Sequence, residues 1–92
     1  MNDVETGRLF GHAQRAAGVI AAKHRGDLAG AEALLSAFPD DATRVRGFCL
    51  LAELALSLVR SQTGQSMDEL VQELSLTMAA ATMQAPPDAA SP

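Results

Sequence analysis

Apolar residues recur along this chain at intervals of three and four positions, which is the spacing of helices that bury one face. Three short breaks interrupt the pattern, and each pairs a helix-ending residue with a residue that caps the next helix. The breaks are Gly26-Asp27, Pro39 followed by Asp40 or Asp41 as the cap, and Gly64 to Ser66. The sequence therefore predicts an all-α fold, a compact four-helix bundle-like domain with helices at about residues 3–25, 28–38, 41–63 and 67–83.

The third helix has an apolar surface that is too wide for one neighbouring helix to cover. At roughly 100° per residue, its apolar side chains occupy well over half of the circumference. They are Val45, Phe48, Cys49, Leu51, Ala52, Leu54, Ala55, Leu56, Leu58 and Val59. This pattern predicts either the central helix of the core or part of an interface between chains, and it predicts that Cys49 is a small buried hydrophobic side chain.

The fourth helix opens with a capping box, in which Ser66 and Glu69 are three residues apart ahead of a periodic run. Its first apolar stripe is expected to face inward and comprises Met67, Leu70, Val71, Leu74, Met78 and Ala81. A second stripe cannot be covered by the same neighbour and comprises Leu76, Ala79, Ala80 and Met83. We therefore predict a partner interface formed by Leu50, Leu54, Leu76, Ala80 and Met83.

The first helix carries Gly7 near its start and two further glycines, Gly11 and Gly18, that are seven residues apart. Glycine inside a helix costs up to about 1 kcal/mol relative to alanine, so a role in close packing is one explanation for both. A kink or break near either glycine is the alternative. The sequence leaves open whether this helix is continuous.

Charge argues against nucleic acid as the main partner, because the net charge is −4 and duplex binding requires concentrated positive charge. The only basic surface lies on the first helix. Its candidate nucleic-acid contacts are Arg8, Arg15 and Lys23, which would serve a small DNA-associated regulator. From Ser66 onward the chain carries acids and no base, so it is electrically polar from end to end.

Residues suited to catalysis or metal binding are few. His12 and His24 are twelve positions apart, whereas two ligands on one helix require a spacing of three or four. His12 is expected to be a solvated surface residue, and His24 is expected to lie at the helix end. The sequence predicts no enzyme, no metal, no cofactor and no small-molecule substrate.

Length and composition favour a small domain that gains from a partner. A chain of 92 residues buries only about 60–65% of its unfolded surface, so we expect one domain over residues 1–83. Residues 84–92 are rich in Pro, Ala and Ser and are predicted to form a disordered tail. The abundance of Ala, with Arg favoured over Lys, indicates a high-GC bacterium or its phage.

Two features of the sequence, its cysteine content and its lack of long apolar segments, indicate a cellular compartment. Cys49 is the single cysteine, which excludes an intrachain disulfide and suits a reducing environment. We find neither a signal peptide nor about twenty consecutive apolar residues, so we expect no membrane association and a cytoplasmic location.

Excess apolar surface and a methionine-bearing last helix favour protein binding. We therefore predict a non-catalytic helical protein–protein interaction or regulatory module that self-associates as a homodimer. The alternatives are the small DNA-associated regulator and a structural assembly subunit with open-ended association.

Overall fold

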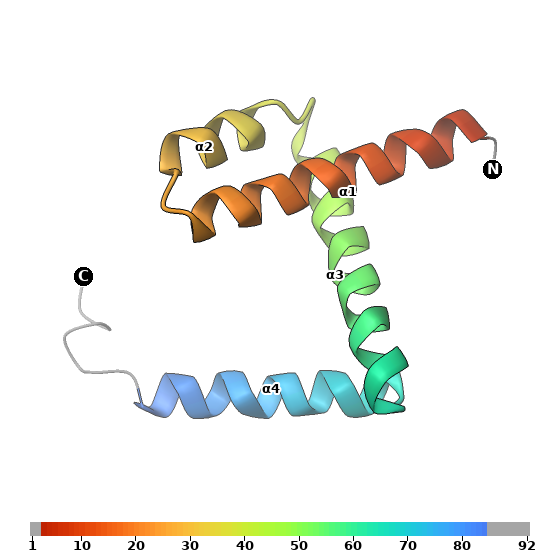
Figure 1. The fold of residues 1–92 in the computed structure, drawn as a ribbon, viewed down its shortest axis with the longest axis vertical. Coiled ribbons are helices and arrows are strands. Elements are labelled where there is room, and N and C mark those ends of the chain that lie inside the picture. The colour runs from red at the N-terminus through yellow and green to blue at the C-terminus, as the bar shows by residue number, and fades with distance from the viewer. Residues whose placement is uncertain (1–2, 85–92) are drawn as a thin grey trace. The chain divides into compact units, whose positions relative to one another are not determined.

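A computed structural model describes residues 3–84 of the chain, and within them it contains four helices and no strand (Figure 1). The helices are α1 (Asp3–His24), α2 (Leu28–Ser36), α3 (Asp41–Thr63) and α4 (Met67–Gln84). The predicted all-α fold class is confirmed, and each predicted helix boundary lies within two residues of the observed one. Gln84 is the last residue of α4, and the rest of the predicted tail lies outside the described residues.

Local capping chemistry sets the helix boundaries. Gly26 and Gly64 adopt φ angles of +80° and +75°, the left-handed conformation that glycine adopts without strain at a helix end. The side chain of Asp27 caps α2 by accepting the Gly30 N–H at 2.9 Å. Asp40 caps α3 in the same way, accepting the Thr43 N–H at 2.7 Å.

The second helix ends two residues earlier than the sequence predicts. After Ser36 the N–H of Phe38 donates to the carbonyl of Leu35, three residues back, at 3.4 Å. Hydrogen bonds between residues three apart are frequent at helix ends. Pro39 has no backbone N–H to donate, so the helix does not continue through it.

The first helix is continuous through Gly11 and Gly18. At Gly18 an added Cβ would lie 3.2 Å from Cδ1 of Leu34, so the missing side chain lets α1 and α2 approach closely. At Gly11 an added Cβ would meet nothing within 4 Å. Only one of the two predicted close-packing glycines therefore has that role within the described structure.

The core lies between α1 and α2, which pack against each other. Val19, Ala22 and Ala31 form its buried cluster, and partly buried side chains surround them. The prediction that α3 is the central core helix is wrong, because its only buried residue is Gly47. Small residues explain the difference: alanines on α1 bring α2 close, so α1 takes the central position.

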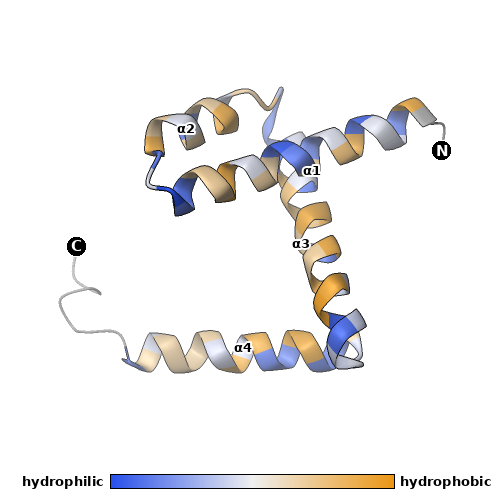
Figure 2. Cartoon of the chain, viewed as in Figure 1, coloured by the Kyte–Doolittle hydropathy of each residue, from blue (hydrophilic) through white to orange (hydrophobic). Residues whose placement is uncertain are grey.

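The chain divides into two compact units at a point inside α3. The first unit comprises α1, α2 and α3 as far as Ala55, and the second begins at Leu56 and includes α4. Figure 2 shows that apolar residues continue along α3 on both sides of this point and along α4.

The second unit is held mainly by polar contacts around the turn between its helices. The Arg60 Nε donates to the carbonyl of Gln65 at 3.2 Å, and the Gln65 side chain donates to Glu73 at 2.8 Å. The predicted capping box is confirmed: Ser66 Oγ accepts the Glu69 N–H, and Glu69 accepts the Ser66 N–H. None of the described helices is long and apolar enough to cross a membrane.

Candidate functional site

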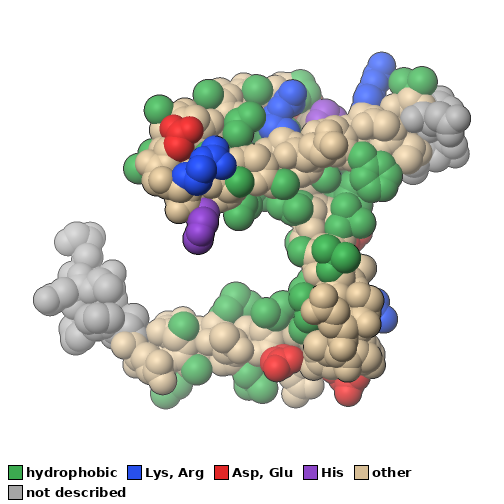
Figure 3. Space-filling view, viewed as in Figure 1, with side chains coloured by type: hydrophobic (Ala, Val, Ile, Leu, Met, Phe, Trp, Pro, Cys, Tyr) green, Lys and Arg blue, Asp and Glu red, His purple; other side chains and the backbone are tan. Residues whose placement is uncertain are grey.

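The most extensive exposed apolar surface of the second unit lies on α4. Leu70 is the only buried residue of this helix, and every residue from Val71 to Gln84 is exposed. Hydrophobic side chains are visible along α4 in the space-filling view (Figure 3). Five large ones are between 40% and 86% exposed: Val71, Leu74, Leu76, Met78 and Met83.

This exposure corrects one prediction about α4. The stripe expected to face inward is covered only at its start, where Leu70 is buried and Met67 is half-buried. Val71, Leu74 and Met78 are uncovered because no other helix of the second unit extends along them. Both apolar stripes of α4 therefore belong to the candidate surface.

The predicted interface residues fall in both units. Leu50 is half-buried and Leu54 is 41% exposed, and both lie on the part of α3 in the first unit. Leu76, Ala80 and Met83 are exposed on α4 in the second unit. The assignment of these five residues to an interface stays a prediction.

Further apolar side chains are exposed on α3. Val45, Leu58 and Val59, which belong to the wide apolar surface predicted for this helix, are each more than one third exposed. Cys49 is exposed as well, so the prediction that its thiol is buried is wrong. The reason is that α1 contacts the opposite side of α3, the side that carries Gly47.

A hollow of about 390 Å³ lies in the first unit between α1 and the start of α3. Glu5, Arg8, Leu9 and His12 line it from α1, and Thr43 and Arg46 line it from α3. Its lining combines two guanidinium groups, an imidazole and a carboxylate, so the positive charges are partly compensated within the hollow.

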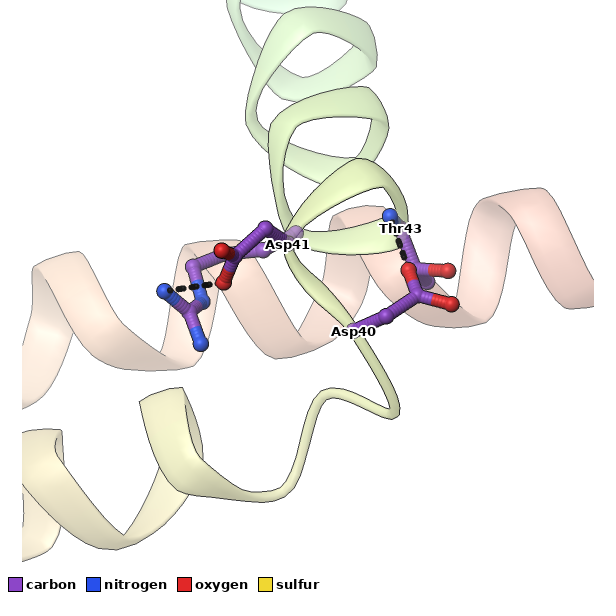
Figure 4. A network of polar contacts seen from close by, with 4 residues as sticks. Asp40, Asp41 and Thr43 are labelled. Carbon is purple, nitrogen blue, oxygen red and sulfur yellow. Dashed lines mark hydrogen bonds and ion pairs between the residues drawn. The ribbon is translucent and has the colours of Figure 1, made fainter.

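Asp40 adds a further negative charge near this hollow. Hydrogen bonds from Thr43 lower the pKa of the Asp40 carboxyl, and the charges of Arg46 and His12 lower it further. Figure 4 shows the Asp40 carboxylate directed at Thr43. The next residue, Asp41, forms an ion pair with Arg44 at 3.2 Å. The carboxylates here thus stabilise the first turn of α3.

His12 is not the solvated surface residue that the sequence predicts. Its side chain is half-buried, and its ring centroid is 6.3 Å from that of Phe38. The helix end predicted for His24 is confirmed. Among the described residues no group of three or more His, Cys, Asp or Glu side chains is placed to hold a metal ion.

The three candidate nucleic-acid contacts have different surroundings. Arg8 is exposed beside the hollow, and Lys23 is exposed in the last turn of α1. Arg15 is half-buried: its Nη1 donates to the carbonyl of Ala37 at 3.1 Å, and its guanidinium lies 5.4 Å from the centre of the Phe38 ring. Arg15 therefore holds the end of α2, while its assignment to nucleic acid stays a prediction.

Gly47 is a structural residue that sequence reasoning missed. An added Cβ would lie 2.8 Å from the carbonyl oxygen of His12, so only glycine lets α3 pass this close to α1. The available signal was that Gly47 is the one glycine inside a long helix otherwise made of larger residues.

Comparison with known proteins finds no matching family model, no similar curated protein and no similar solved structure.

Proposed function

We propose that this protein is a non-catalytic interaction module that associates with a second copy of itself through the exposed apolar side chains of α4. The observation that carries this proposal is the exposure of every residue from Val71 to Gln84, five large apolar side chains among them. Stripes of exposed large apolar side chains are typical of protein–protein interaction sites.

Helix physics supports the same proposal. Most helical stability in proteins comes from packing of an apolar face rather than from the helix alone. Complete burial of a Val, Leu or Met side chain contributes about 1.5–3 kcal/mol. A partner that covers α4 would therefore supply the stability that its own unit does not.

The first unit gives less support to the alternatives. A DNA-associated regulator needs free basic side chains on one surface, whereas Arg15 is engaged with Ala37 and Phe38. The exposed thiol of Cys49 suits a reducing compartment and supports our placing the module in the cytoplasm of a bacterium or of a phage-infected cell.

The proposal is tested by solution mass from light scattering across a concentration series. We expect twice the chain mass for the unmodified protein and the chain mass for Leu74→Asp with Leu76→Asp, which places one charge on each apolar stripe. Thr77→Asp with Gln84→Asp is the matched control, because it also adds two charges to exposed positions of α4, and neither position belongs to an apolar stripe. This control should remain dimeric.

The other outcomes are equally specific. The chain mass at every concentration of the unmodified protein would overturn self-association. A mass that rises without limit would instead support the structural assembly subunit, since a head-to-tail contact does not close.

A further inference from the structure

The inference concerns the direction in which two copies of α4 pair, and it rests on the self-association proposed above. We propose that α4 packs antiparallel against α4 of a second copy along a seam formed by Met67, Val71, Leu74, Met78 and Ala81. Three features of the described helix lead to this arrangement: the spacing of the seam, its exposure and the position of every charge.

The seam has the repeat of a two-helix contact. Successive members are four, three, four and three positions apart, which keeps them on one side of a helix that winds around a similar partner. The seam extends over 15 of the 18 residues of α4, which is about 22 Å at 1.5 Å per residue. The second stripe, from Leu76 to Met83, covers about half of that length.

The exposed side chains of the seam are the ones that a second helix would cover. Leu74 is 40% exposed and Met78 is 61% exposed, and Val71 before them is 45% exposed. Leu70, on the flank of the seam, is 4% exposed. The apolar face is thus covered at the first turn of α4 and vacant for the remaining turns.

Charge decides the direction. All charged side chains of α4 lie in its first seven residues, as Asp68, Glu69 and Glu73, and none occurs from Leu74 to Gln84. In a parallel pair the acids of both copies would lie side by side at one end and repel each other. In an antiparallel pair the acidic half of each helix faces the uncharged half of the other.

The helix dipoles add to this preference. Antiparallel pairing places the positive N-terminal end of one helix beside the negative C-terminal end of its partner, whereas parallel pairing places like ends together. A pair related by a two-fold axis also closes, since the same surface is used by both copies. The predicted axis passes near Ser75, midway between Met67 and Gln84.

Residues that flank the seam provide the test. Asp68, Ser75 and Thr82 are spaced by seven and lie on one flank, and all three are exposed. In the antiparallel pair residue 75 faces residue 75 of the second copy, and residue 68 faces residue 82. In a parallel pair each of the three positions faces its own equivalent.

The experiment traps these neighbours as disulfides in the full chain, with Cys49→Ser as the background. Asp68→Cys, Ser75→Cys and Thr82→Cys are oxidised singly and in mixed pairs, with one protein of each pair carrying a tag so that mixed dimers separate on a gel. Gln72→Cys, on the opposite side of α4, is the control. Thiols held side by side have effective concentrations near millimolar, so paired positions at micromolar protein should react about a thousandfold faster than the control.

We expect fast trapping for Ser75→Cys alone and for the mixture of Asp68→Cys with Thr82→Cys, and slow trapping for Asp68→Cys alone. Asp68→Cys trapping with itself as fast as Ser75→Cys would overturn the antiparallel direction and leave self-association intact. Control-level rates at all three positions, in a protein that light scattering finds dimeric, would overturn the α4 seam. A monomeric mass would overturn the proposed function as well.

Discussion

The two units of the chain achieve stability in different ways. In the first, α1, α2 and the start of α3 all contribute to one buried cluster around Val19 and Ala31. In the second, Leu70 is the only buried side chain among the described residues, and polar contacts at the turn hold the rest. The difference shows that capping alone does not bury a helix: α4 has a complete capping box, but its own unit leaves most of its side chains exposed.

Aromatic packing illustrates the contrast. Phe38 is buried in the first unit, where its ring centroid lies 6.3 Å from that of His12 and 6.2 Å from that of Phe48. The guanidinium of Arg15 covers another side of the same ring. In α4 only Leu70 is buried, and every residue from Val71 to Gln84 is exposed, which is why we propose that a second copy supplies the missing contacts.

The largest effect is expected where the second unit depends on that copy. Leu74→Asp with Met78→Asp would bury two uncompensated charges at the seam, which costs at least about 4 kcal/mol in total and weakens association roughly a thousandfold. Sedimentation equilibrium measures the change. Leu76→Asp with Met83→Asp lies on the shorter stripe and should weaken association less; equal effects would remove the distinction between the stripes.

A core substitution should affect the first unit without dissociating the dimer. Phe38→Ala removes a ring that is 5% exposed and should lower the free energy of unfolding by about 3 kcal/mol. Urea unfolding followed by circular dichroism measures this loss. Phe10→Ala is the control, because its ring is 46% exposed and its removal should cost less than about 1 kcal/mol. Similar costs at both positions would contradict the core described here.

Two glycine-to-alanine substitutions should change the stability of the first unit in opposite directions. Gly47→Ala places a Cβ 2.8 Å from the backbone oxygen of His12 and should destabilise the first unit by about 1–3 kcal/mol. Gly11→Ala meets nothing within 4 Å and should stabilise α1 by up to about 1 kcal/mol. Thermal unfolding distinguishes them, and stabilisation by Gly47→Ala would show that α1 and α3 do not cross closely at this residue.

The smallest effect concerns the start of α4 and depends on pH. Hydrogen bonds from Ser66 lower the pKa of the Glu69 carboxyl in the folded chain. The stability that this carboxylate contributes is therefore complete above the ordinary glutamate pKa and is lost as the pH falls through the lowered value. Circular dichroism of the protein should record this loss, and Glu69→Gln should reduce its pH dependence. An unchanged pH profile would contradict the charged capping box.

Local chemistry explains what the sequence could predict. Asp27, Asp40 and the pair Ser66 and Glu69 act on N–H groups a few residues away, so the helix boundaries followed from neighbouring residues alone. Gly26 and Gly64 ended their helices for the same reason. The four helices and the all-α fold class were therefore predictable.

Burial was less predictable, because it depends on which elements meet. An apolar position on a helix shows that burial of its side chain would be stabilising. It does not show which helix packs against that position. Cys49 and Leu74 have patterns typical of buried residues, yet both are exposed. His12 has charged neighbours in the sequence, yet its ring packs near Phe38. Of the candidate site, the sequence identified Leu76, Ala80 and Met83 but missed the exposed part of the seam.

Hydrogen exchange of the backbone amides as a function of protein concentration tests the central claim most directly, because it measures the protection of each helix separately. We predict that α4 loses protection on dilution, as the second copy dissociates, while the amides of α1 and α2 around Val19 and Ala31 stay protected. Protection of α4 that does not change with concentration, in step with that of α1, would contradict the account and assign the cover of α4 to its own chain.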